Sequence, residues 1–199
     1  MNSSSFGPPL AVARDAPIVF FDRDGTLNED AGYTHRIEDW RWIPGAIDAI
    51  VRLNRMGYRT IVVSNQAGVA RGLYSLDEVH RLHRFVDQEL RRHGGCIDAF
   101  YVCPHHPEHG DRLVCDCRKP APGMLHAALS ATGAPAGSCW MIGDADSDML
   151  SAVAAGVRAL QIVSGDRCQA SVVRPWATVD SVAHAPRVIV SSQSRLASE

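Results

Sequence analysis

The chain has 199 residues, a formal net charge of −2 and a hydrophobic fraction of 46%, which together fit one globular domain with a sizeable core. No apolar run reaches the roughly 18 residues of a membrane helix, and a charge so close to zero gives no basic surface for nucleic acid. The first residues lack the basic start and apolar stretch of a signal peptide. We therefore expect a cytoplasmic monomer that binds neither membrane nor nucleic acid.

Short apolar runs alternate with amphipathic segments along the chain. The runs predict strands at 18–21, 60–63, 97–102, 140–142 and 159–163, and the amphipathic segments predict helices at 44–57, 76–93, 124–131 and 147–155. This alternation predicts an α/β fold of the Rossmann-like, three-layer kind, with a mostly parallel sheet covered by helices on both faces. The stretch between the first two strands is too short for a large cap domain.

The two ends of the chain differ in composition from its middle. Residues 1–16 are rich in Ser, Gly and Pro, and residues 186–199 are polar and Ser-rich beyond a short apolar run at 188–190. We expect a flexible N-terminal segment over 1–16, a single domain over 17–185, and a C-terminal tail over 186–199 that is either frayed or an additional edge element.

Two aspartates, two positions apart, follow the first predicted strand. Asp22 and Asp24 lie at its carboxyl end, and Gly25 allows a sharp turn directly after them. Paired carboxylates in this place suit a hard cation such as Mg²⁺ or a nucleophile beside a general acid. A simple turn after a strand would carry the same residues.

Other polar groups follow later strands or lie in the long loop. Ser64 and Asn65 end the second strand and can donate hydrogen bonds to phosphoryl oxygens, although a lone Ser there is also typical of a helix cap. Lys119 is the single lysine among 20 basic residues, which indicates a place that needs a compact ammonium. Asp144 ends the fourth strand, so it is expected at the same edge of the sheet as Asp22.

Residues with sulfur and imidazole ligands gather in the loop at 103–117. The candidate ligands are Cys103, His105, Cys115 and Cys117, and His106 and His109 are alternatives to His105. Three thiolates and one imidazole suit a closed, tetrahedral, structural Zn²⁺ site. Unligated cysteines in a loop would leave reactive thiols exposed, which we consider the weaker interpretation. Zinc would fix this loop directly before Arg118 and Lys119.

Taken together, the motifs of residues 17–165 resemble those of the haloacid dehalogenase superfamily of phosphatases: Asp-x-Asp-Gly-Thr at 22–26, then Ser, then Lys, then Gly-Asp-x-x-x-Asp at 143–148. The resemblance implies that Asp22 attacks phosphorus to form an aspartyl-phosphate, and that Asp24 protonates the leaving oxygen and then activates water. It also implies Mg²⁺ held by the Asp22 carboxylate, the Asp24 carbonyl and Asp144.

The same resemblance implies roles for the remaining residues of these motifs. Ser64 and Lys119 would stabilise charge on the transferring phosphoryl group. Asp148 would orient the loop and Lys119 rather than bind metal, and Asp146 has no assigned role.

The cysteine loop and the segment 65–72 are similar to those of D-glycero-D-manno-heptose 1,7-bisphosphate phosphatases, in which the matching Cys, His, Cys and Cys bind zinc. The similarity implies that Asn65 and Arg71 contact the substrate and that Arg71 and Arg118 hold the phosphate that is retained. The expected reaction removes the 7-phosphate of the heptose bisphosphate, in a route to nucleotide-activated heptose.

Two other functions stay open at this point. One is a histidinol-phosphate phosphatase, which has the same motifs and a similar zinc loop. The other is a zinc-stabilised binding module without catalysis, which would have no use for the full set of polar residues. The sequence also leaves open which anomer at carbon 1 is preferred.

Overall fold

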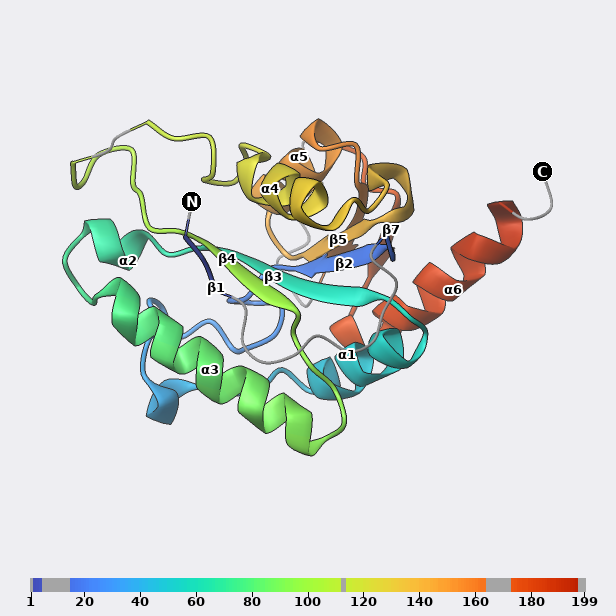
Figure 1. Cartoon of the computed structure of the whole chain (residues 1–199), viewed down its shortest axis with the longest axis horizontal. Helices are drawn as coiled ribbons and strands as arrows, with labels where there is room; N and C mark the ends of the chain where they lie inside the picture. Colours follow the sequence, from blue (N-terminus) through green and yellow to red (C-terminus); the bar gives the residue numbers. More distant parts are fainter. Residues whose placement is uncertain (1, 5–14, 112–113, 164–172, 197–199) are drawn as a thin grey trace.

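The computed structural model describes residues 2–4, 15–111, 114–163 and 173–196. They form one sheet of six parallel strands in the order β4-β3-β2-β5-β6-β7, and β1 pairs antiparallel with β4 at one edge (Figure 1). The strands are β1 (Asn2–Ser4), β2 (Ile18–Phe21), β3 (Arg59–Asn65), β4 (Ala99–Cys103), β5 (Trp140–Gly143), β6 (Arg158–Ile162) and β7 (Ala177–Val179).

Helices cover both faces of the sheet, as the alternation of strands and helices predicts (Figure 1). One face carries α1 (Ala46–Arg55), α3 (Leu76–Arg92) and α6 (Ala185–Leu196), and the other carries α4 (Gly123–Thr132) and α5 (Asp146–Ala154). The short elements are α2 (Ala67–Ala70) and the 3-10 turns η1 (Ile37–Asp39), η2 (Ala136–Ser138) and η3 (Val182–His184). The predicted three-layer fold is confirmed.

Strand β2 lies at the centre of the sheet because all four of its side chains are apolar. Val19 and Phe21 face the core shared with α1 and α3, while Ile18 and Phe20 face the core shared with α4 and α5. A strand buried on both faces reads as a continuous apolar run rather than an alternating one. The first charged side chains after this run therefore mark the point where the chain leaves the core.

The order of strands reverses at β2, which creates a crevice at the carboxyl edge of the sheet. The chain continues from β2 to β3 and β4 on one side, and later returns to place β5 and β6 on the other side. Ligands of open parallel sheets bind at such a switch point. Here it brings together the ends of β2, β3 and β5, where Asp22, Ser64 and Asp144 lie.

The C-terminal region differs from the expected tail or edge element. Residues 185–196 form helix α6, which packs on α1 and on η3 and buries Ile189 completely. The predicted N-terminal segment lies largely outside the described residues, apart from β1 and the residues leading into β2. The predicted domain boundaries stay predictions.

The connection from β2 to β3 contains only η1, α1 and loops, so no separate cap domain stands between these two strands. Within the described part of the chain, no helix combines the length and the apolar character needed to cross a bilayer.

Candidate active site

Asp22 and Lys119, which are far apart in the sequence, meet at the end of β2. The Lys119 ammonium donates to Asp22 Oδ1 at 2.5 Å and to the Val63 carbonyl oxygen at 2.9 Å. Its third partner is Asp148 Oδ1 at 2.6 Å. These three oxygens surround the ammonium, and the predicted contact between Asp148 and Lys119 is present.

Burial and charge shift the pKa values of this group in opposite ways. Burial raises the pKa of Asp22 to about 7, because the attraction of Lys119 only partly offsets the loss of water and the Asp148 carboxylate lies close by. Burial also opposes the charge on Lys119, but Asp148 and Asp22 outweigh it, so the pKa of Lys119 is raised. Without a further cation, the site holds more negative charge than Lys119 alone can balance.

Asp144 lies so close to the turn after β2 that only glycine fits opposite it. A Cβ at Gly25, which has a φ of +83°, would lie 2.4 Å from Asp144 Oδ2. Carboxylate oxygens of Asp22, Asp144 and Asp148 lie within 4.8 Å of one another. Carboxylate oxygens are the ligands that Mg²⁺ prefers. The donor set and its excess negative charge fit a divalent cation at Asp22 and Asp144, with Asp148 occupied by Lys119.

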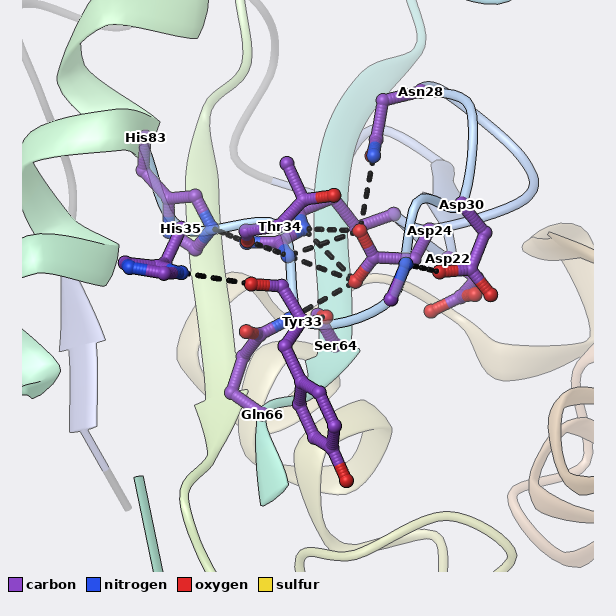
Figure 2. A network of polar contacts seen from close by, with 12 residues as sticks. Asp22, Asp24, Asn28, Asp30, Tyr33, Thr34, His35, Ser64, Gln66 and His83 are labelled. Atoms are coloured by element: carbon purple, nitrogen blue, oxygen red, sulfur yellow. Dashed lines mark hydrogen bonds and ion pairs between the residues drawn. The ribbon is translucent and has the colours of Figure 1, made fainter. Parts of the chain in front are cut away.

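The carboxylate of Asp24 is held by three side chains (Figure 2). The Arg23 guanidinium contacts both Asp24 oxygens, at 2.8 Å for the shortest pair, and also donates to the Thr34 carbonyl oxygen at 2.6 Å. Asn28 donates to Asp24 Oδ1 at 3.0 Å and Gln66 to Asp24 Oδ2 at 3.1 Å. These donors fix the side chain that the sequence predicts as the general acid.

Arg23, Asn28 and Gln66 are polar residues of this site that the sequence-based prediction missed. Arg23 is completely buried although it is one of the largest side chains of the chain. Its one signal in the sequence is its place between two motif aspartates. Gln66 was noted only as part of a loop, and its amide is oriented by Tyr74, whose hydroxyl donates to Gln66 Oε1 at 2.8 Å.

Ser64 and Asn65 end β3, which lies beside β2, but they have different partners. The Ser64 hydroxyl accepts from Gln66 Nε2 at 2.8 Å, which leaves its own proton available for a phosphoryl oxygen. The Asn65 amide forms a reciprocal pair with the Lys119 backbone, donating to its carbonyl oxygen and accepting from its N–H, both at 3.0 Å. Asn65 therefore holds the Lys119 backbone in place.

The four predicted sulfur and imidazole ligands converge at the end of β4. Cys103 Sγ lies 3.7 Å from Cys115 Sγ and 3.6 Å from His105 Nδ1, and His105 Nδ1 lies 3.3 Å from Cys117 Sγ. A tetrahedral zinc site with bonds of about 2.3 Å to sulfur and 2.0 Å to nitrogen has edges of roughly 3.5–3.8 Å. The donor set therefore fits Zn²⁺, with His105 rather than His106 or His109 at the nitrogen position.

Burial and a bound cation act in opposite directions on the thiols of this cluster. Burial raises the pKa of the Cys103 and Cys117 thiols, which on its own would keep both protonated. Zinc binds the deprotonated form, so a metal ion in their midst would reverse this preference. Cys103 and Cys117 are buried, whereas His105 and Cys115 are half-buried, and four protein ligands would fill all positions of a tetrahedral ion.

The two predicted arginines lie beside this loop. Arg118 donates to the His105 carbonyl oxygen at 3.1 Å, and Arg71 Nη2 lies 3.0 Å from His106 Nε2. A cavity of about 290 Å³ is lined by Arg118, Lys119, Pro120 and part of the cysteine loop, namely His105, His106, Pro107, Val114 and Cys115. Arg118 therefore borders this cavity, and Arg71 lies next to it through its contact with His106.

A match to a protein-family model indicates the general class of protein. A family model described as HAD-hydrolase-like matches residues 116–189, the part that carries Lys119, Asp144 and Asp148. The parallel fold and the carboxylate–lysine site at its switch point define a phosphatase of the haloacid dehalogenase-like class.

Relatives that match a longer part of the chain identify the family within this class. The D-glycero-β-D-manno-heptose-1,7-bisphosphate 7-phosphatase of Escherichia coli K12 is 38% identical over 188 residues, covering 92% of this chain and 98% of its own. The one from Pasteurella multocida is 42% identical over 142 residues, covering 70% of this chain and 77% of its own. This chain belongs to the D-glycero-β-D-manno-heptose-1,7-bisphosphate 7-phosphatase family.

A solved structure agrees with this family. The D,D-heptose 1,7-bisphosphate phosphatase of B. bronchiseptica, in complex with magnesium and phosphate, superposes with a TM-score of 0.80 at 26% identity, covering 88% of this chain and 99% of that one. The similarity thus extends over the whole fold as well as over the sequence.

Proposed function

We propose that this protein hydrolyses the 7-phosphate of D-glycero-β-D-manno-heptose 1,7-bisphosphate, with Asp22 as the nucleophile. The observation that carries the proposal is the contact between Asp22 and Lys119 at the end of β2, beside Asp144. It occurs in a chain that matches 98% of the length of a relative with this activity in its name. That name also favours the β anomer at carbon 1.

Asp22 attacks the phosphorus atom, and the bond from phosphorus to the sugar oxygen at carbon 7 breaks. Asp24 gives its proton to that oxygen as it leaves, and the phosphoryl group is then bound to the Asp22 carboxylate as an acyl phosphate. In the second half of the reaction, Asp24 takes a proton from water as the water attacks phosphorus. The bond from phosphorus to the Asp22 oxygen then breaks, which releases phosphate and the free Asp22 carboxylate. Lys119 and the Ser64 hydroxyl donate to the phosphoryl oxygens, where charge develops.

Two metals complete the proposal. Asp22, Asp144 and the Asp24 carbonyl would hold Mg²⁺, which supplies positive charge beside the phosphoryl oxygens. Cys103, His105, Cys115 and Cys117 would hold a structural Zn²⁺. Zinc would then fix the loop that carries Arg118 toward the substrate without taking part in the chemistry.

Phosphate release tests the proposal directly. With Mg²⁺ present, we expect efficient turnover of the heptose 1,7-bisphosphate, with the β anomer preferred over the α anomer. Histidinol phosphate and fructose 1,6-bisphosphate serve as comparison substrates. Equal or better turnover of histidinol phosphate would keep the mechanism and reject the substrate.

The Asp22→Asn variant tests the nucleophile. We expect kcat to fall by at least about 10⁴-fold, because the amide cannot form the aspartyl-phosphate, while the fold and substrate binding remain. Steady-state kinetics, circular dichroism and titration calorimetry measure these three properties. Residual turnover near that of the unchanged protein would reject Asp22 as the nucleophile.

A further inference from the structure

His106 is not one of the four zinc ligands proposed above. One of its ring nitrogens faces the guanidinium of Arg71, and we infer from its other contact that this nitrogen carries a proton. Its Nδ1 accepts from the backbone N–H of Glu108 at 3.1 Å. A neutral imidazole has one acceptor nitrogen, so Nε2 carries the proton. That Nε2 lies 3.0 Å from Nη2 of Arg71, which is also a donor. Two donors this close, with no acceptor between them, are arranged for an oxygen atom that accepts from both.

A second metal ion is the competing interpretation of the residues around His106. Ligand atoms of His106, Glu108 and His109 lie within 4.8 Å of one another. The acceptor nitrogen of His106 is, however, occupied by the backbone N–H of Glu108, and a guanidinium faces the other nitrogen. A metal ion would need that occupied lone pair and would lie beside the positive charge of Arg71. The arrangement favours an anion.

The position of His106 relative to Arg71 is fixed by contacts between two loops. The Ala70 N–H donates to the Pro104 carbonyl oxygen at 3.1 Å, and the Gln66 N–H donates to the Cys103 carbonyl oxygen at 2.8 Å. A Cβ at Gly110 would approach the Ala70 Cβ to 3.2 Å. The loop after β3, which carries Arg71, and the cysteine loop, which carries His106, therefore pack directly together.

His106 also lines the cavity of about 290 Å³ that contains Arg118 and Lys119. Lys119 reaches Asp22 from this cavity, whereas His106 and Arg118 lie on its walls. A sugar with two phosphates needs one group at Asp22 and a second set of donors further out. Nε2 of His106 and Nη2 of Arg71, which lie 3.0 Å apart, form such a set of donors beside the part of the cavity wall that His106 provides.

We propose that His106 is a substrate-binding residue, whose Nε2–H and the guanidinium of Arg71 together bind the phosphate that is not hydrolysed. The proposal rests on the proposed function, because it needs a bisphosphate substrate. It makes His106 a determinant of the preference for a bisphosphate over the same sugar with one phosphate.

The test compares two substrates on two variants. We measure kcat/KM for the heptose 1,7-bisphosphate and for the heptose 7-phosphate, which lacks the phosphate at carbon 1. In His106→Ala, the preference for the bisphosphate falls by about tenfold, mainly through KM, since a hydrogen bond to a charged group is lost. In His106→Gln, whose amide N–H replaces Nε2–H, most of the preference returns.

His109→Ala is the matched control, because its ring lies 4.7 Å from that of His106 on the same exposed loop. It keeps the bisphosphate preference, and zinc content per chain stays the same in all three variants. An unchanged preference in His106→Ala, an equal loss in His109→Ala, or a second metal ion lost from both would overturn the proposal. A wild-type protein inactive on both heptose phosphates would instead reject the proposed function from which the inference starts.

Discussion

Arg23 is a buried cation that fixes the side chain of Asp24, the proposed acid–base residue. Its guanidinium contacts both oxygens of Asp24 and lies 3.4 Å from Nε2 of His83, a buried histidine on α3 whose ring stacks on Phe100. Arginine cannot lose its proton, so a charged His83 would face a permanent positive charge. Burial, and then Arg23, hold the pKa of His83 well below its usual value.

This arrangement predicts a pH dependence of stability. The pKa of His83 is lower in the folded than in the unfolded protein, so below about pH 6.5 the unfolded chain takes up the proton first. Stability is therefore lost as pH falls from about 6.5 toward the depressed pKa. We expect His83→Gln to reduce the slope of unfolding free energy against pH by up to about 1.4 kcal/mol per unit between pH 5 and 6.5.

Denaturant unfolding at several pH values measures this slope. His126→Gln, a substitution of an exposed histidine on α4, is the control and should leave the slope as it is. Parallel slopes for wild type and His83→Gln would show that His83 takes up its proton in the folded protein as readily as in the unfolded chain.

Among the elements, the cysteine loop is the one whose order we attribute to a metal ion. We expect a zinc-selective chelator, used with excess Mg²⁺, to lower kcat/KM on the heptose bisphosphate by roughly ten- to a hundredfold. The physical reason is that Arg118 and His106 lose their fixed positions when the loop loses its ligand centre. Activity should return with added Zn²⁺, and full activity in zinc-free protein would contradict this role.

Helix α6 gives a second prediction at this scale. Ile189 is fully buried against the α1 side of the sheet, whereas its neighbour Val190 is 42% exposed. Ile189→Ala should lower the unfolding free energy by about 2–4 kcal/mol because it leaves a cavity. Val190→Ala should change it by no more than about 0.5 kcal/mol. Equal effects in denaturant unfolding would show that α6 is not packed as described.

The same helix shows what the sequence pattern could not predict. The run at 188–190 consists of β-branched residues, which favour strands, and Pro186 stands two positions before it. The helix forms because Ala185 and Ile189, one turn apart, pack with Val182 of η3 into the core beside α1. Tertiary packing decides helix formation more than propensity does. The five strands predicted from the sequence were predictable because each is a mainly apolar run bounded by turn residues, although 97–102 contains Asp98 and 159–163 contains Gln161.

At the site, the rule for strand ends was enough to bring Asp22, Ser64 and Asp144 together. The roles of Arg23 and Gln66 could not be predicted, because both depend on where their side chains point. Arg23 points inward and contacts Thr34 and Asp24. Gln66 points toward Asp24, because the Tyr74 hydroxyl donates a hydrogen bond to its amide oxygen and so orients the amide. Side-chain direction is set by packing, which a local sequence pattern does not contain.

For the molecule as a whole, the excess negative charge at the switch point predicts stabilisation by Mg²⁺. A ligand that binds only the folded state at 100 times its Kd adds about 2.7 kcal/mol, which raises Tm by roughly 5–10 °C in a chain of this size. Asp144→Asn should be more stable than wild type without metal and should gain less from Mg²⁺. Thermal unfolding followed by circular dichroism measures both, and equal Mg²⁺ shifts would contradict the assignment.

The reciprocal pair between the Asn65 amide and the Lys119 backbone marks a boundary in the segment that runs from the cysteine loop to Lys119. One part holds Lys119, and the outer part holds Arg118 and His106. Lys119 is anchored to β3 by this pair and by the Val63 carbonyl oxygen, independently of the cysteine cluster. The outer part, with Arg118 and His106, can therefore change its sequence or length over evolution while the ammonium beside Asp22 keeps its place. A new leaving group can be accommodated by altering the outer part alone, with the phosphoryl-transfer centre inherited unchanged.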